Sequence, residues 1–519
     1  SSIICFLIVK YMNLLSSAST FSFFTLISRV LGYFRDILIA TFLGASIYAD
    51  AFFVAFRLPN TFRRLFAEGV FNAAFIPSYT EERINSKKKG KKFADDVLNL
   101  LIIVLLGIIF LIEIFTPAVV YLIAPGFYGD IEKFNLAVEL SRITFPFLFF
   151  VSISSLFAGI LNSNNKFAAA AAAPIILNIF LILSLLLSYF FKLNFGLNLS
   201  YALTLSGLFQ LIFLIFFTRH YYKPSINFKI IINSKIRFFF KKLLPSIFSS
   251  GVTQINMLVG TIIASLEAGA VSYLYYADRI YQINLAIAGV AIGTVALPEL
   301  SKKIKIGNIL EVMNIQNKSI ELCLLLSIPA CFGLIIASQQ ITSALFGYGS
   351  FLEKDVILTA EALKYFGYGV PAFALVKVLS NFFFARDDTK IPFYISIFSV
   401  SLNIIISIIY FKELGFIIIP IATSIATWSA VIVYLILLLK LKYFNVSSIF
   451  YINFIKTVIC AVIMSLVLHF LINFFEDKLI FANHYKSFYL IMIVGLAATM
   501  YLSSARILGI FKIKNFKTN

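Results

Sequence analysis

Long apolar runs, separated by short polar connections, follow one another along almost the whole chain. The run LLIIVLLGIIFLIEIF (100–115) contains a single charged residue. Runs of roughly 20 apolar residues predict transmembrane helices, and their lack of polar alternation argues against a membrane β-barrel. The chain is therefore predicted to be an all-α polytopic membrane protein. Fourteen spans are expected, at 17–43, 49–82, 96–123, 134–161, 167–190, 197–218, 240–265, 270–300, 313–338, 356–384, 390–411, 415–440, 449–474 and 486–510.

Composition and charge agree with this class and add an orientation. Hydrophobic residues make up 61% of the 519 residues and charged residues 13%, with a mean hydropathy of +0.95. The net charge of +19 gathers in every second connection, such as RINSKKKGKK (83–92) and RDDTK (386–390). Basic connections stay in the cytoplasm, so both termini are expected on the cytoplasmic side of the membrane. Because membrane topology explains the basic residues, no nucleic-acid partner is expected.

Spaced matches within the chain indicate an internal repeat. Pro146 and Asn178 recur 225 residues later as Pro371 and Asn403, and Tyr-Ala-Asp at 48–50 recurs at 276–278. A parallel repeat places a substrate site between two lobes near the membrane midplane. We predict an N-terminal extension (1–11), an N-lobe (12–218), a basic linker (219–242), a C-lobe (243–440), and two further helices with a basic tail (441–519).

The segment 28–82 carries more charge than an apolar segment should. Ionisable groups at membrane depth are costly, so they usually face a water-filled cavity or a substrate path. Arg29, Arg35 and Arg63 are candidate cavity-lining residues, since too few acids accompany them to neutralise them all. The alternative for Arg29 and Arg35 is an internal salt bridge. Among the remaining charged residues, Arg57 has the alternative of extending to a membrane interface, and Arg64 and Glu68, four residues apart, are expected to pair. The others are the acids Asp36 and Asp50.

The second lobe also carries charged residues within an apolar segment, SYLYYADRIYQ (272–282). Arg279 is the candidate ligand there, with Asp278 as its neutralising neighbour or a hydrogen-bond partner across the lobes. Ser272 is a candidate donor, although a turn serine is the commoner explanation. Guanidinium groups bind phosphate through paired hydrogen bonds and stay charged in a low dielectric. Arginines from both lobes therefore point to an anionic ligand such as a diphosphate.

Residues that would suggest an enzyme or a metal protein are sparse. The four cysteines lie in apolar runs and the three histidines are scattered, so neither a disulfide framework nor a metal site is predicted. Asp387 and Asp388 form a possible magnesium pair for an enzyme acting on polyprenyl phosphates. They lie in a short basic turn whose counterpart NSNNK (162–166) has no acids, which disfavours that alternative. No catalytic residue is assigned.

Several motifs resemble those of a known family. They are SRVLGYFRD (28–36), DAFFVAFRLPNTFRRLFAEGVFNAAFIP (50–77), YYADRI (275–280) and GVAIGTVALPELS (289–301). Together they resemble the lipid II flippases of the MurJ (MviN) type, within the multidrug/oligosaccharidyl-lipid/polysaccharide (MOP) exporter superfamily. The likeness extends over most of residues 12–510.

The resemblance implies a two-lobed bundle of fourteen helices with MATE-like architecture, a central cationic cavity, and a groove for the polyprenyl tail beside the last two helices. It implies export of lipid II, the undecaprenyl-diphosphate-linked peptidoglycan precursor, to the periplasmic leaflet for cell-wall synthesis. In such flippases the arginines matching Arg29, Arg35, Arg63 and Arg279 line the cavity, and the acids at Asp36 and Asp50 also matter.

Two positions depart from the pattern of the family that the chain resembles. Gln282 stands where relatives often carry an acid, and Asn403 is followed one turn later by Ser407, so no sodium site is predicted. We expect alternating access by a monomer that contacts lipid II and membrane lipids. We expect no cofactor, with the membrane potential as the driving force. The alternative is an exporter of another polyprenyl-linked glycan or of drugs, but a drug exporter would need a coupling acid and no surplus of arginines.

Overall fold

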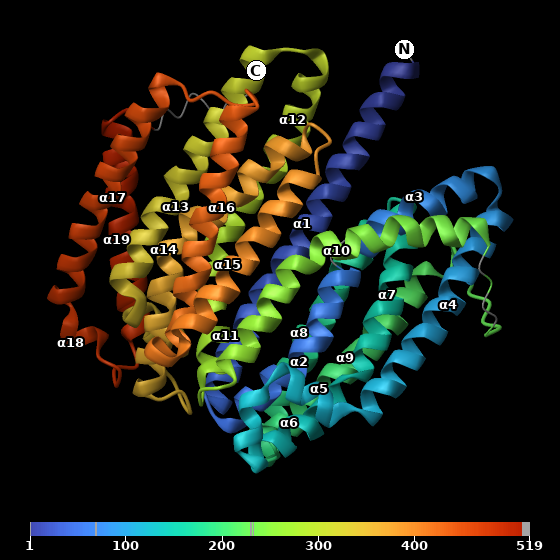
Figure 1. The fold of residues 1–519 in the computed structure, drawn as a ribbon, viewed down its shortest axis with the longest axis horizontal. Coiled ribbons are helices and arrows are strands. Elements are labelled where there is room, and N and C mark those ends of the chain that lie inside the picture. The colour runs from blue at the N-terminus through green and yellow to red at the C-terminus, as the bar shows by residue number, and fades with distance from the viewer. Residues whose placement is uncertain (1, 68–69, 229–230, 232, 511–519) are drawn as a thin grey trace. The chain divides into compact units, whose positions relative to one another are not determined.

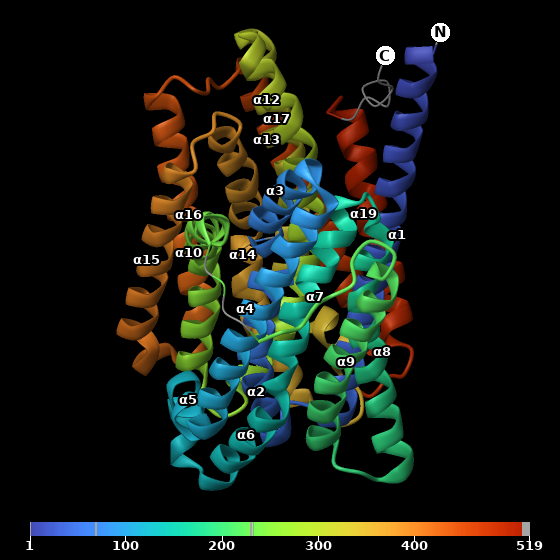
Figure 2. The same cartoon turned by 90° about the vertical axis from the view of Figure 1, so that its right-hand side faces the viewer.

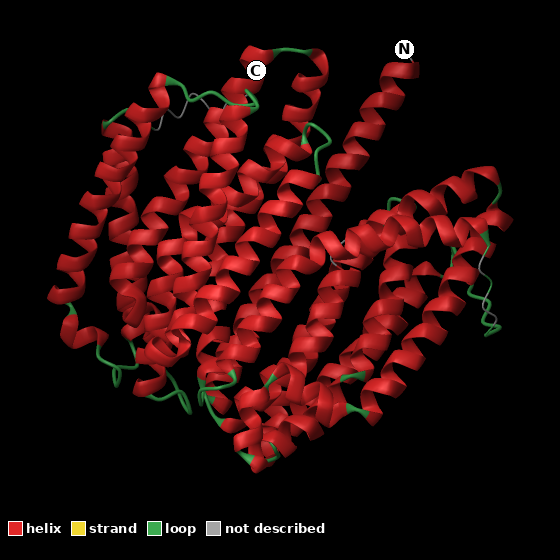
Figure 3. Ribbon diagram, in the orientation of Figure 1, coloured by secondary structure: helices red, strands yellow, loops and turns green. Residues whose placement is uncertain are grey.

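The computed structural model describes residues 2–67, 70–228, 231 and 233–510, and every regular element in these ranges is helical (Figures 1 and 3). The helices of residues 2–264 are α1 (Ser2–Leu43), α2 (Ile47–Ala67), α3 (Val70–Asn85), α4 (Lys87–Ile114), α5 (Thr116–Ile123), η1 (Pro125–Gly129), α6 (Ile131–Thr144), α7 (Pro146–Ser163), α8 (Phe167–Phe191), α9 (Phe195–Thr218) and α10 (Ser234–Ala264). Those of residues 270–507 are α11 (Ala270–Leu285), η2 (Ala286–Ala291), α12 (Ile292–Ile306), α13 (Ile309–Phe346), α14 (Glu353–Phe384), α15 (Lys390–Leu414), η3 (Gly415–Ile417), α16 (Ile418–Lys440), α17 (Ser448–Phe474), α18 (Glu476–Leu479) and α19 (Lys486–Ile507).

The described helices confirm an all-α, multi-pass membrane protein. Nine helical segments within the described ranges are long and apolar enough to cross a bilayer. Several predicted spans are divided into shorter elements: 49–82 contains α2 and α3, and 96–123 contains α4 and α5. The number fourteen stays a prediction, because short helices such as α5 do not qualify as spans by length.

Contacts divide the chain into two compact units, Ser1–Gly269 and Ala270–Asn519. In the first unit α1 packs on α8, α7 on α9, and α10 against α3. Its core includes stacked or edge-on rings from three helices, Phe71 and Phe75 on α3, Phe93 on α4 and Phe239 on α10. Helix α10 is therefore grouped with the first unit, whereas the sequence placed its span in the second lobe. The predicted lobe boundaries stay a prediction.

A proline inside α2 is accommodated by a neighbouring helix. Pro59 has no N–H, so the carbonyl of Ala55 four residues earlier cannot receive the usual helical hydrogen bond. The hydroxyl of Thr144, the last residue of α6, donates to that carbonyl at 2.9 Å and is completely buried. The contact satisfies a buried polar group and fixes α2 to α6, which pack closely. Arg57 and Arg63 lie on either side of this point.

In the second unit, α13, α14 and α16 pack together and α17 pairs with α19 (Figures 1 and 2). The path from α11 to α12 is one continuous helix interrupted by the π-helical turn η2. A Cβ added to Gly289 of η2 would lie 3.0 Å from the Cα of Ala374, so this turn touches the backbone of α14. Single π turns often occur at functional sites, and here one lies beside a central helix of the unit.

In each unit, the side chain of one buried asparagine binds the backbone of a connection more than 100 residues further along the chain. These connections follow α9 in the first unit and α16 in the second. In the first unit Asn99 of α4 donates to the carbonyl of Ser225 at 2.9 Å and accepts from the N–H of Asn227 at 2.9 Å. In the second, Asn317 of α13 donates to the carbonyl of Asn445 at 2.9 Å and accepts from the N–H of Ser447 at 3.1 Å. The two sets of contacts match in kind, as expected for a repeated arrangement.

Candidate functional site

The two arginines of α1 have different surroundings. Arg29 is exposed, whereas Arg35 is 6% exposed. The Nε and Nη2 atoms of Arg35 donate to Asp36 Oδ1 at 2.9 and 2.7 Å, and its Nη1 donates to Asn178 Oδ1 on α8 at 2.9 Å. Asn178 in turn donates to the carbonyl of Ser28 at 2.9 Å. The internal salt bridge considered for Arg35 is thus present, formed with Asp36. The role of Arg35 as a ligand stays a prediction.

The arginines near the end of α2 remain accessible in part. Arg63 donates from Nε to Asn60 Oδ1 at 3.1 Å, within one helical turn. Arg64 points to α10, where its Nη1 lies 3.1 Å from the sulfur of Met257. The expected partner of Arg64, Glu68, lies outside the described residues. Two guanidinium groups therefore extend from neighbouring positions of one helix, both partly buried.

Asp50 is buried in an ion pair that the sequence analysis did not foresee. Its Oδ2 accepts from Lys133 Nζ at 2.6 Å and from the N–H of Gly269 at 3.0 Å, and Asp50 is 1% exposed. The same ammonium lies 4.2 Å from the centre of the Phe127 ring. This carboxylate joins α2, α6 and the chain before α11, so its observed contacts are structural. Lys133 follows Glu132 near the start of α6, and adjacent charges at a helix start are typical of solvent-exposed residues. The sequence therefore does not indicate that Lys133 is buried.

In the second unit the predicted residues lie on α11. Arg279 is partly buried, and its Nη2 donates to the hydroxyl of Tyr275, one turn earlier, at 3.0 Å. Its guanidinium carbon lies 4.8 Å from the centre of that ring, a cation–π contact. Asp278 accepts a hydrogen bond from the side chain of Gln282, one turn later. Ser272 is completely buried. The helix thus presents a cation supported by an aromatic side chain.

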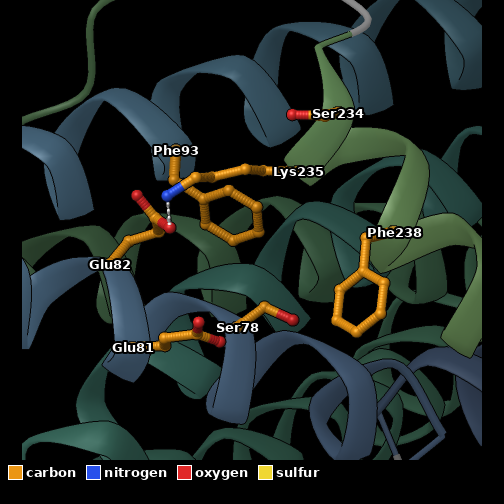
Figure 4. Close-up of a pocket in the computed structure, with 7 residues that line it drawn as sticks. All are labelled: Ser78, Glu81, Glu82, Phe93, Ser234, Lys235 and Phe238. Carbon is orange, nitrogen blue, oxygen red and sulfur yellow. Dashed lines mark hydrogen bonds and ion pairs between the residues drawn. The ribbon is translucent and has the colours of Figure 1, made fainter.

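A small cavity of about 140 Å³ in the first unit lies away from these arginines (Figure 4). It is lined by Ser78, Glu81 and Glu82 of α3, Phe93 of α4, and Ser234, Lys235 and Phe238 of α10. Lys235 forms an ion pair with Glu82 across it. Two carboxylates and one ammonium give a negative sum, which does not suit a diphosphate. This cavity is therefore no candidate for the anion site.

The acid pair that suggested an enzyme has a structural explanation. Asp388 Oδ1 accepts hydrogen bonds from the N–H groups of Lys390 and Ile391 at 3.0 and 3.1 Å, which caps the start of α15. Within the described ranges no three His, Cys, Asp or Glu side chains come together as a metal site. The buried Asn403 accepts from the hydroxyls of Ser407 and Thr423 at 3.4 and 3.5 Å.

One basic residue escaped the sequence analysis. Lys377 interrupts the apolar run AFALVKVLSNFFF (372–384) of α14, and its side chain is exposed although the helix is central to its unit. A lone lysine in a run of this kind was the available signal, by the same reasoning that selected the arginines.

Comparison with known proteins identifies the family. A family model described as lipid II flippase MurJ matches residues 39–490. A probable lipid II flippase MurJ of Rickettsia prowazekii (strain Madrid E) is 37% identical over 517 residues, covering 97% of this chain and 99% of that one. A solved lipid II flippase MurJ in an inward closed conformation is 29% identical, with a TM-score of 0.80 over 94% of this chain and 98% of that one.

A more distant structure extends the likeness of fold alone. It is an inward-facing multidrug resistance MATE transporter of the MOP superfamily, with a TM-score of 0.66, 14% identity, and coverage of 79% of this chain and 93% of that one. The family match spans most of the chain, covering the predicted N-lobe from residue 39 onward and the whole predicted C-lobe. The chain therefore belongs to the MurJ family of lipid II flippases, which are transporters rather than enzymes.

Proposed function

We propose that the chain carries lipid II from the cytoplasmic to the periplasmic leaflet of the inner membrane by alternating access. The observation that supports it most strongly is the 37% identity to a probable lipid II flippase over 97% of the chain. The chemistry of the described residues agrees, because the candidate site groups are predominantly cationic. A headgroup that carries a diphosphate is attracted by such groups, whereas a hydrophobic cation is repelled.

Arg29, Arg35, Arg63 and Arg279 are the proposed diphosphate ligands. Arg29 is exposed, and Arg63 and Arg279 are partly buried, so a ligand can reach all three. Arg35 is held by Asp36 and Asn178, and its part requires exchange of one of these hydrogen bonds for a phosphoryl oxygen. Binding of the headgroup by arginines keeps it out of hydrocarbon while the polyprenyl tail stays in the lipid.

The proposal includes an orientation and an energy source. Both termini are placed in the cytoplasm, the protein acts as a monomer, and an inside-negative potential favours outward movement of the negative headgroup. The available energy is about 2.3 kcal/mol per charge per 100 mV. No cofactor takes part.

Depletion of the protein in its host tests the function directly. Lipid II is then measured separately in each leaflet, in a strain without a second flippase. We expect lipid II to accumulate in the cytoplasmic leaflet while its total amount does not fall. Unchanged delivery to the periplasmic leaflet would refute the proposal.

Single Arg-to-Ala substitutions at the four positions test the ligands. Each is expected to abolish complementation of the depleted strain while the protein stays at its normal level in the membrane. Arg237→Ala, which removes an exposed arginine of α10, is the matched control and should complement fully. Arg35→Lys keeps the positive charge but loses the hydrogen bond to Asn178. Its activity therefore shows whether Arg35 is needed for its charge or for its contact with α8. Full activity of all four alanine variants would exclude a cationic site built from these residues.

A further inference from the structure

The connection between α12 and α13 carries an exposed apolar tip, residues 306–310. Ile306, the last residue of α12, and Ile309 and Leu310, the first two of α13, are 64%, 68% and 85% exposed. Single exposed aliphatic side chains are normal on a protein surface, but here three lie within five consecutive positions. We therefore asked what holds the tip in place and what it can contact.

The turn inside the tip is closed by its own backbone and side chains. Gly307 has a φ of +78°, and its N–H donates to the carbonyl of Ile304 at 3.0 Å. The N–H of Asn308 donates to the carbonyl of Lys303 at 3.2 Å, which completes the Schellman arrangement that ends a helix. The side chain of Asn308 accepts from the N–H of Glu311 at 3.2 Å, and Glu311 forms an ion pair with Lys303. The tip is thus presented in one defined shape.

The tip extends beyond the other connections at this end of the second unit (Figures 1 and 2). Asn317 of α13 contacts the connection at 445–447, and Arg386, which follows α14, donates to the carbonyl of Tyr443 in the same connection at 2.9 Å. Leu310 lies seven residues before Asn317, about 10 Å further out at 1.5 Å per residue. These connections therefore leave the tip uncovered.

Distance along α13 also separates the tip from the bilayer. The apolar run of α13 begins at Leu322, twelve residues or about 18 Å after Leu310. The headgroup layer on each side of the hydrocarbon core is only about 5–8 Å thick. The tip lies on the side of the basic connections, which the proposed orientation places in the cytoplasm. A lipid surface therefore does not account for its exposed aliphatic residues.

The internal repeat indicates that a turn at this place does not need apolar residues. The motif AFIP (74–77) is matched by VALP (295–298), 221 residues later. At that spacing the three apolar positions of the tip correspond to Asn85, Lys88 and Lys89, at the turn between α3 and α4. All three of these are exposed. The aliphatic residues of the second turn thus need a cause other than folding.

The charges around the tip select the kind of partner. Lys302 and Lys305 are exposed, whereas Glu311 is engaged in its ion pair and Glu299 lies about 10 Å before the tip along α12. A second copy of the chain would bring like charges together, and the chain's own tail KIKNFK (512–517) contains no acid. Like charges in a contact are unfavourable, so an acidic surface suits the tip better than either.

We propose that the tip is a docking site for a protein in the cytoplasm whose surface offers an apolar groove with an acidic rim. Ile306, Ile309 and Leu310 enter the groove, and Lys302 and Lys305 pair with the rim. Burial of the aliphatic side chains supplies affinity, while the complementary charges steer the partner to the tip. The tip contains none of the candidate substrate ligands, so docking and transport can be tested separately.

Photo-crosslinking in living host cells identifies the partner. p-Benzoyl-phenylalanine replaces Leu310 in the full chain, and in the matched control it replaces Lys89, the corresponding residue of the first unit. We expect a protein adduct from position 310 that position 89 does not give, and mass spectrometry of the adduct names the partner. Addition of Lys302→Glu and Lys305→Glu should reduce the adduct about tenfold or more, because the acidic rim is then repelled.

Titration of the purified partner against the full chain in nanodiscs then measures the contact. Ile309→Ser with Leu310→Ser is expected to weaken binding about tenfold or more, since burial of each aliphatic side chain contributes about that factor. Lys88→Ser with Lys89→Ser, the matched change in the first unit, should leave the affinity unchanged. Because the tip is exposed, its serine variant should keep the unfolding midpoint of the unsubstituted chain.

The other outcomes overturn the docking site. An adduct with phospholipid would show that the tip meets the membrane, and an adduct with a second copy of the chain would show self-association. Absence of an adduct at position 310, or unchanged affinity of the partner for the serine variant, would remove the contact itself. Slower transport of lipid II by the serine variant in proteoliposomes would assign the tip to transport instead. Failure of the unsubstituted chain to transport lipid II overturns the proposed function and not the docking site.

Discussion

Asp50 illustrates how a charge in an apolar segment can serve the fold. Its carboxylate is almost completely buried, with Lys133 at 2.6 Å and the N–H of Gly269 at 3.0 Å. Removal of one member of a buried pair leaves the other charged and uncompensated, which costs far more than the pair contributes. The carboxylate thus joins segments that are far apart in sequence.

Asp50→Asn is expected to lower the free energy of unfolding by about 3–5 kcal/mol, because it leaves the ammonium of Lys133 buried without its counter-charge. The measurement is the midpoint of thermal unfolding of the purified protein. Asp130→Asn is the matched control. It keeps the cap that accepts from the N–H of Lys133 at 3.1 Å, because Asn caps a helix about as well as Asp, so little change in the midpoint is expected. In Asp50→Leu with Lys133→Met most of the loss should be recovered, and an additive loss would contradict the pairing.

At the scale of single residues, the sequence selected candidate side chains but could not show what they contact. Arg35 and Asn178 are 143 positions apart, and only the packing of α1 on α8 brings them together. Helical geometry sets Arg35 and Asp36 about 100° apart, yet the long arginine side chain folds back onto its neighbour. Charge at membrane depth signals function or buried pairing alike, so the sequence could not tell Arg29 from Asp50.

Two polar connections are held by the asparagines of α4 and α13. Asn99→Ala should release the connection around 225–228, since one side chain satisfies three of its backbone groups. Hydrogen exchange of the full-length protein is the measurement, and faster exchange is expected at 225–228 but not at 445–447. Asn317→Ala should give the reverse pattern, so each variant is the control for the other. If either variant speeds exchange equally in both connections, the idea that each asparagine stabilises only its own connection is wrong.

Tyr222 lies in the connection that Asn99 contacts, and it makes the stability of that connection depend on pH. Burial, together with its hydrogen bond to Asp95 Oδ1 at 2.7 Å, raises the pKa of Tyr222 above its usual value. In the unfolded chain the phenol loses its proton near pH 10, while in the folded chain it keeps it. Its contribution is therefore complete below pH 10 and is lost as the pH rises further. Tyr222→Phe should flatten the fall of the unfolding midpoint between pH 10 and 11.

The helices themselves were largely predictable, whereas the interruptions within them were not. Apolar runs located α8, α9 and α17 well, because single spans bounded by polar turns leave little ambiguity. The run 270–300 was taken as one span, and nothing in its composition signals the π turn within it. Pro146 and Pro371, matched as repeats, begin α7 and lie inside α14 respectively, so the same residue type has two structural outcomes.

For the whole molecule, the sign of the membrane potential is the sharpest test of the proposed energy source. In proteoliposomes, a potassium gradient with valinomycin sets the potential in either direction. Outward transfer of lipid II should be faster with an inside-negative potential and slower with the reverse, because about 2.3 kcal/mol per charge is available at 100 mV. Equal initial rates at both signs would contradict a potential-driven step.

Membrane class, family and transport function could all be predicted from the sequence, because they depend on long apolar runs and extended motifs. The close contacts that hold the first unit together could not. Helix α10 belongs by contact to the first unit, which Gly126 illustrates: its N–H donates to the hydroxyl of Ser265 at 3.1 Å, and a Cβ there would overlap the backbone of Ser265 and Leu266. Such close contacts between distant residues leave no trace in hydropathy.

The π turn η2 makes the length of its helix as informative as its composition. Each residue of a π turn rotates the chain by less than a residue of an α-helix, so the six residues of Ala286–Ala291 rotate it about as far as five residues of an α-helix would. Deleting one of them would therefore restore a regular α-helix and leave Gly293 in its place against Asn381. Deleting one residue from the regular helix before the turn would instead rotate everything after it by about 100°. Loss of a single codon should accordingly be tolerated within the turn and not before it, and among relatives alignment gaps are expected to gather at this turn.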